Sequence, residues 1–100
     1  MAQGINTIDY AVLAVSTAAV GLASGTPALP AKAKRVFITA ETQAARWRAD
    51  GTDPTSTEGH VLAAADSISF TGANYRSLLE NIKFIATSAG DSALKITYYD

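Results

Sequence analysis

The sequence contains no cysteine among its 100 residues, and it has a single histidine, His60. The absence of cysteine excludes disulfide bonds and thiolate metal sites, and it indicates assembly in a reducing compartment. One histidine without a second histidine or a cysteine does not form a zinc site by itself. We therefore expect neither a metal nor a cofactor.

The sequence also lacks an excess of either positive or negative charge. Eight Lys and Arg residues balance nine Asp and Glu residues, which gives a formal net charge of −1, and no run of like charges occurs. A protein that binds nucleic acid through general phosphate neutralisation needs a basic patch or stripe. We therefore expect no nucleic-acid partner.

No apolar run is long enough for a membrane helix. The most apolar segment, residues 10–25, is shorter than the roughly 20 residues that a spanning helix needs, and Ser16, Thr17 and Gly21 interrupt it. The residues before it include Asp9 but no Lys or Arg, so the positively charged start of a signal peptide is missing. We expect a soluble, unprocessed chain with no membrane contact.

What the sequence does contain is alternation of apolar and polar residues. Hydrophobic residues make up 48% of the chain, and in residues 35–42, 45–50, 82–87 and 93–99 every second residue is apolar or small. A period of two is that of β-strands, and turn residues separate these segments. The expected fold class is all-β: a small antiparallel β-sandwich or barrel with an N-terminal arm, forming a single domain.

The chain is predicted to consist of residues 1–34, an arm or first strand with a connector, and residues 35–100, the β core. Residues 8–16 fit a strand or a helical stripe, and a strand is favoured because the following elements are strands. The segment "SAGDSA", residues 88–93, separates two alternating runs and predicts a β-hairpin. Residues 73–81 predict a loop or a single helical turn.

The core is expected to be thin, because alanine accounts for much of the apolar content. In the segment "ARWRA", Trp47 is expected to face inward, whereas Arg46 and Arg48 face solvent or a partner. The large side chains expected in the core are Val36, Ile38, Trp47, Leu62, Ile68, Phe70, Ile82, Phe84, Leu94, Ile96 and Tyr98.

The segment "RWRADGTDPTSTEGH", residues 46–60, contains many of the residue types found in active sites. Asp-Gly supplies a positive φ, Asp-Pro starts a second turn, and Thr and Ser hydroxyls bond nearby backbone, so the segment predicts a tight turn. Its acids, Asp50, Asp53 and Glu58, lack the spacing of a calcium loop. His60, Ser56 and Asp53 are the residue types of a Ser-His-Asp catalytic triad. All three lie in one turn, whereas the members of a triad usually come from separate elements. We expect no metal site and no enzyme.

Residues 35–72 and 82–99 resemble a group of small virion proteins of tailed bacteriophages. The shared pattern is a hydrophobic strand, a glutamate, Arg-aromatic-Arg, Asp-Gly-Thr, Pro-Thr and Gly-His, followed by a Phe-Ile strand. The resemblance implies a virion structural protein assembled in the host cytoplasm, and within that class a capsid decoration (cement) protein on the major capsid protein lattice. The matching residues are Glu41, Arg46, Trp47, Arg48, 50–52, Pro54, Thr55, Gly59, His60, Phe84, Ile85 and Gly90.

A second resemblance is confined to the turn. The segment "RWRADGTDPTST" resembles the hairpin of non-catalytic β-sandwich modules appended to chitobiase-type enzymes, which implies sandwich geometry and, as an alternative function, carbohydrate binding. That function needs exposed aromatic residues in a row, whereas Tyr98 and Tyr99 are expected on opposite faces. A head–tail adaptor or tail component is a further alternative, because it also needs a compact β fold with edges open to neighbours.

Two pairs of residues are predicted to bind the partner, which is the major capsid protein or another virion subunit. Arg46 and Arg48 share a strand face, and arginine makes bidentate contacts typical of interfaces; a solvated face with local ion pairs is the alternative. Tyr10 and Val12 lie in the apolar N-terminal segment. That segment either completes a neighbour's sheet by strand addition or fills its own core. We also expect a homo-oligomer.

Overall fold

The computed structural model describes residues 7–23, 29–41, 43–70, 75–87 and 92–100, which form eight strands and one short helix. The residue bounds of the elements follow in chain order. They are β1 (Thr7–Val15), β2 (Val20–Gly21), β3 (Arg35–Ala40), β4 (Ala45–Arg48), β5 (His60–Leu62), β6 (Ser67–Phe70), α1 (Arg76–Asn81), β7 (Lys83–Ala86) and β8 (Ser92–Tyr99).

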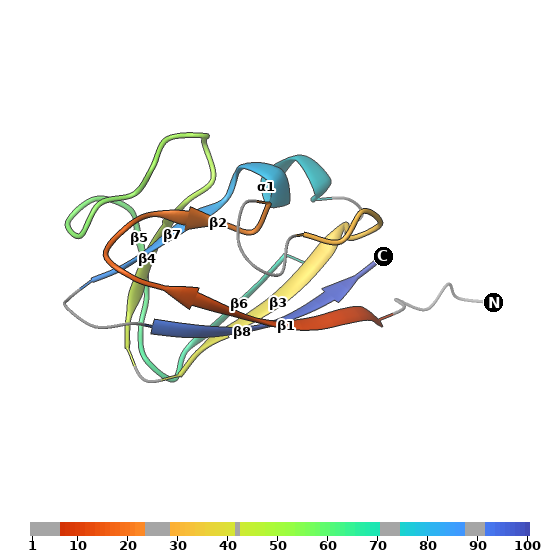
Figure 1. Cartoon of the computed structure of the whole chain (residues 1–100), viewed down its shortest axis with the longest axis horizontal. Coiled ribbons are helices and arrows are strands. Elements are labelled where there is room, and N and C mark those ends of the chain that lie inside the picture. Colours follow the sequence, from red (N-terminus) through yellow and green to blue (C-terminus); the bar gives the residue numbers. More distant parts are fainter. Residues whose placement is uncertain (1–6, 24–28, 42, 71–74, 88–91) are drawn as a thin grey trace.

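The strands form two antiparallel sheets of four strands each. Sheet A has the order β1-β8-β3-β6 and sheet B the order β2-β7-β4-β5, and the two groups of strands lie in separate layers in Figure 1. Side chains of both sheets belong to one buried cluster. The all-β, antiparallel prediction is confirmed.

Alternation holds where the sequence pattern was clearest. In β3, Val36 and Ile38 are fully buried while Phe37 between them is exposed. In β8, Leu94, Ile96 and Tyr98 are buried while the residues between them are only half-buried. Hydrophobic burial of every second side chain therefore explains why these segments are strands of sheet A.

The core differs from the expected one in several members. Trp47, Ile68 and Phe70 are only partly buried and pack against the core from the side. Leu22 and Leu79 are nearly or fully buried although neither lies in an alternating run. Of the expected core side chains, the fully or almost fully buried ones are Val36, Ile38, Leu62, Ile82, Phe84, Leu94, Ile96 and Tyr98.

Residues 7–15 form a strand, as favoured from the sequence. Ala11, Leu13 and Val15 point into the core, whereas Tyr10 and Val12 are exposed. The partner strand decides this facing, because Leu13 pairs with the fully buried Leu94. The inner side of this segment therefore fills part of the chain's own core.

The predicted hairpin around residues 88–93 is wrong in its strand pairing. Residues 88–91 lie outside the described residues, but β7 before them pairs with β2 and β4 in sheet B. β8 after them pairs with β1 and β3 in sheet A. The chain therefore crosses between the sheets here, since both neighbours of each strand come from elsewhere in the sequence.

The helix α1 is the short helical turn predicted around residues 73–81. Leu79 is its buried residue, and Arg76 ties the helix to the connector before β3 by donating hydrogen bonds to the carbonyl oxygens of Pro30 (2.6 Å) and Ala33 (3.0 Å). Among the described residues, no helix is long and apolar enough to cross a membrane.

Tyr98, near the end of the inner strand β8, is buried with an unsatisfied hydroxyl. Its Oη atom has no hydrogen-bond partner in the described part of the chain, and the side chain is 1% exposed. Burial, followed by the negative charge of Asp9 on β1, raises the pKa of Tyr98 to about 12. The hydroxyl is therefore held in its neutral form at a cost in desolvation.

We predict that Tyr98→Phe stabilises the protein by about 1 kcal/mol at neutral pH, because it removes a buried hydroxyl without a partner. Below pH 10 Tyr98 is protonated in the folded and the unfolded chain. As the pH rises from 10 to 12 the unfolded chain releases this proton first, so wild type loses about 2–3 kcal/mol through this group. Urea unfolding of both proteins across this pH range measures the difference.

Tyr99, the half-buried residue next to Tyr98, supplies the matched control for this experiment. Tyr99→Phe removes the same hydroxyl from a half-buried residue on the other side of β8, so it should not give the gain in stability at neutral pH. A Tyr98→Phe variant that loses stability at neutral pH would show that the hydroxyl is bonded, contrary to the structure.

Candidate interaction surfaces

The outer face of sheet A carries three of the large apolar side chains that are exposed to solvent. Tyr10 is 57% exposed, Val12 42% and Phe37 40%. Tyr10 pairs with Thr97 of β8, and Thr97 pairs with Phe37 of β3, so these side chains form one row across three strands. We call Tyr10, Val12, Thr97 and Phe37 the apolar row.

Charge on this face is partly neutralised. Lys95, beside Val12 in the pairing of β1 with β8, forms an ion pair with Glu41 (Nζ–Oε1 3.3 Å). The hydrogen bond to Glu41 and the Glu41 charge, with a smaller contribution from Tyr10, raise the pKa of Lys95. The charge of Lys95, beside the apolar row, is therefore paired within the same chain.

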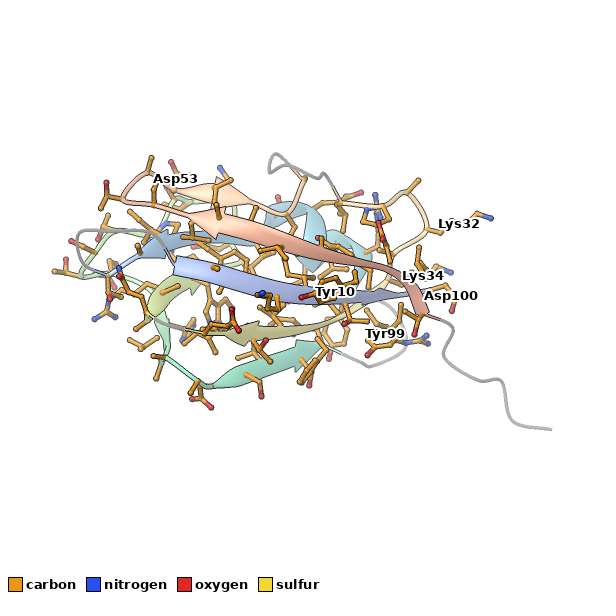
Figure 2. The ribbon with its side chains drawn as sticks, turned by 60° about the horizontal axis from the view of Figure 1, so that its bottom comes forward. Tyr10, Lys32, Lys34, Asp53, Tyr99 and Asp100 are labelled. Atoms are coloured by element: carbon orange, nitrogen blue, oxygen red, sulfur yellow. The ribbon has the colours of Figure 1, made fainter. Side chains whose placement is uncertain are left out.

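One end of the face is polar. Lys34, Tyr99 and Asp100 lie together where β8 ends, whereas Tyr10 lies nearer the middle of the face (Figure 2). Arg35 donates a hydrogen bond to the main-chain carbonyl oxygen of Asp100. The apolar row is therefore bordered by polar and charged groups, the arrangement that marks interaction sites on soluble proteins.

The two predicted arginines lie on β4 in sheet B, whereas Tyr10 and Val12 lie on β1 in sheet A. Arg46 donates hydrogen bonds to the carbonyl oxygens of Ser56 (3.1 Å) and Gly59 (2.8 Å). Arg48 forms a two-pronged ion pair with Asp50, which raises the pKa of the guanidinium and lowers that of the carboxyl. The structure therefore places the four predicted residues as two pairs on different sheets.

The turn between β4 and β5 has the predicted turn chemistry. Gly51 has a φ of +85°, and the Thr55 hydroxyl oxygen accepts hydrogen bonds from the backbone N–H groups of Thr57 (3.3 Å) and Glu58 (3.0 Å). Pro54 is buried, and Asp53 pairs with Lys83 of β7 (2.8 Å). The turn therefore folds back over sheet B and is fixed to it.

This folding back also explains why Ile85 is 8% exposed although the alternation of residues 82–87 places it opposite the core residues Ile82 and Phe84. Ile85 lines a groove of about 390 Å³ together with Thr17 and with Pro54, Thr55 and Ser56 of the turn. The covering turn buries a side chain that alternation alone assigns to solvent.

A second groove, of about 470 Å³, lies between the start of the turn and β5. It is lined by residues 47–50 and 58–60. The His60 ring lies against Trp47 (centroids 4.7 Å apart), and Trp47 in turn meets Phe70 edge-on (5.7 Å). The groove therefore combines one aromatic platform with the polar groups of Arg48, Asp50 and Glu58.

The residues of the hypothetical triad are not brought together in this groove. Asp53 is paired with Lys83, and neither Asp53 nor Ser56 lines the groove that contains His60. Within the described residues, no three His, Cys, Asp or Glu side chains form a group that could hold a metal ion.

Phe37, like Val61, is an exposed apolar residue that was not among the predicted partner-binding residues. The alternation of apolar and polar residues in β3 places Phe37 on the face opposite Val36 and Ile38. A large aromatic residue assigned to the solvent side of a strand is a signal for a binding surface. Its proximity to Tyr10 depends on β8 lying between β1 and β3, which the sequence does not show.

Comparison with known proteins identifies no relative: no family model, no curated protein and no solved structure matches the chain. The fold and these surfaces define a small all-β protein with an exposed apolar row.

The turn predicts a contrast between two glycines. Gly59 has a φ of +135°, and a Cβ there would lie 3.1 Å from the Trp47 carbonyl oxygen and 3.3 Å from Pro54 Cβ. Gly51 also has a positive φ, but a Cβ there would meet nothing within 4 Å. We expect Gly51→Ala to cost about 1 kcal/mol from the backbone alone, and Gly59→Ala more than about 2 kcal/mol from strain plus crowding. Urea unfolding midpoints measure both, and equal costs would contradict the packing of the turn.

Proposed function

We propose that this protein is a phage virion structural protein, and specifically a capsid decoration protein that binds the major capsid protein lattice through the outer face of sheet A. The observation that carries the proposal is the apolar row, with Tyr10, Val12 and Phe37 exposed on the same face of one sheet and Thr97 of β8 between Tyr10 and Phe37. The resemblance of the strands and turn to small virion proteins supplies the class of partner.

The physical basis is burial of apolar side chains on a repeating surface. Fully burying one large apolar side chain is worth about 1.5–3 kcal/mol, and association costs several times that in lost freedom. A single copy with three exposed anchors therefore binds weakly through this row alone. Many copies that contact one another on a lattice add avidity without further anchors.

Phe37→Lys tests the surface. The substitution replaces one of the three large apolar side chains of the proposed contact with a charge, so we expect binding to purified particles to weaken by about tenfold to a hundredfold. Particles lacking the protein are mixed with purified variant, sedimented, and the bound copies are quantified by gel densitometry.

The matched control is Val61→Lys, because Val61 is 55% exposed but lies on β5 in sheet B. It should bind like wild type. Equal binding by wild type and Phe37→Lys, with both proteins folded by circular dichroism, would contradict the assignment of this face.

The copy number in purified particles separates decoration from a head–tail adaptor or tail component. Lattice stoichiometry gives a decoration protein hundreds of copies, whereas a closed ring at the junction holds about a dozen. Gel densitometry of purified particles decides between the decoration role and the adaptor or tail role. Absence of the chain from particles would contradict both roles.

One observation favours a second function, carbohydrate binding. The groove beside Trp47 joins an aromatic platform to charged groups, which is the composition of a sugar site. If the groove binds sugar, wild type should be retained on at least one polysaccharide of a panel, and Glu58→Gln should reduce that retention several-fold. Glu41→Gln, which changes an exposed acid of sheet A, is the control. No retention of wild type would exclude the function.

A further inference from the structure

The edges of the two sheets differ sharply in length. The described edge strands of sheet B, β2 and β5, have two and three residues, and the β6 edge of sheet A has four. The remaining edge, β1, has nine residues. Short edge strands are a common way in which proteins prevent unwanted pairing, and β1 is not protected in this way.

The sequence of β1 protects only its beginning. A register shift lies between Thr7 and Asp9, and the Asp9 side chain accepts a hydrogen bond from the Tyr10 backbone N–H (2.8 Å). From residue 10 to residue 15 the strand reads YAVLAV, without charge, proline or glycine. An edge of this kind is a template for another strand, unless an assembled state covers it.

We propose that β1 pairs in antiparallel fashion with β1 of a second copy, about a two-fold axis at Val12. The result is a continuous eight-stranded sheet with the order β6-β3-β8-β1-β1-β8-β3-β6. A two-fold axis perpendicular to the sheet keeps both inner faces on the same side. The same step covers both long edges and, among the described strands, leaves only the short edges β6, β2 and β5, so the assembly closes as a dimer.

The side chains of β1 are complementary to themselves in this register. Each residue i faces residue 24 − i of the second copy, so the large Tyr10 lies beside the small Ala14 on the outer face. On the inner face Ala11 lies beside Leu13. Asp9 faces Val15 rather than the second Asp9, so no like charges oppose each other, and large residues pair with small ones on both faces.

This dimer does not depend on the proposed virion role. In the dimer the outer faces of the two A sheets lie on the same side of the continuous sheet. The apolar rows of both copies therefore face the same direction. A strand of a different protein could also pair with the β1 edge. The mass of the purified chain distinguishes the two cases, because only pairing with a second copy gives a dimer when no other protein is present.

The first test measures the solution mass of wild type, Val12→Lys and Val12→Glu by analytical ultracentrifugation. Wild type should have about twice the chain mass of 10.4 kDa, because the two-fold axis makes dimerisation self-complementary. Each charged variant should be monomeric, since it places two like charges directly opposite each other on the axis. An equimolar mixture of the two variants should recover the dimer, because the charges across the axis are then opposite.

The control for this test is Phe37→Lys, which adds a charge to the same face two strands away from the edge. It should remain a dimer even though we expect its binding to particles to weaken, so the two proposals fail separately. A monomeric wild type at all concentrations, or a dimer that Val12→Lys leaves intact, would overturn the inference.

A cross-linking variant keeps the test valid if the charged variants unfold. Because the chain has no cysteine, Val12→Cys contains one thiol, and the Cβ atoms of directly opposed residues lie about 4.5–5.5 Å apart. Mild oxidation should therefore give a disulfide-linked dimer on a non-reducing gel. Phe37→Cys should give much less under the same conditions, and equal cross-linking of the two variants would contradict the pairing.

Discussion

The structure depends on the position of β8 between β1 and β3. Leu94, Ile96 and Tyr98 are almost completely buried, and each pairs with residues of both neighbouring strands. Because side chains alternate strictly along a strand, this burial also fixes which residues point outward. A slip of one residue between β8 and β1 would bury Tyr10 and expose Leu13. The apolar row is thus a consequence of the way the core is packed.

The sequence predicts β3 and β8 because large apolar residues alternate there with polar ones, so only one facing is possible. It does not predict the facing of β1, where Tyr10 and Val12 on one side compete with Leu13 and Val15 on the other. The choice is made by β8, a strand far away in the sequence. The failed hairpin has the same origin: the turn residues indicate that the chain reverses, but strand pairing is decided by which apolar faces meet.

The turn shows how residue types of an active site serve a structural purpose. Arg46 is bound to two turn carbonyl groups, Asp53 to Lys83, and Thr55 to the backbone that follows it. These bonds hold the turn over sheet B and bury Pro54 against it. The sequence predicted the turn because Asp-Gly and Asp-Pro have local conformational preferences. It could not predict the bond to Lys83, which depends on β7 lying beside β4.

The apolar row and the β1 edge are two surfaces of the same protein that favour association. Exposed apolar side chains and an unpaired edge both favour association, and a protein that exposes both on the same strand needs partners that cover both. Val12 belongs to the row and to the edge at once. In the proposed dimer the edge is closed by backbone pairing while the row remains free on one side. In the proposed binding to a capsid lattice, the two rows of a dimer would bind together, so the loss of freedom on binding would be shared by twice as many anchors. The low charge of β1 is consistent with this division, because strand pairing is driven by hydrogen bonds and the row by apolar burial, and neither requires an ion pair.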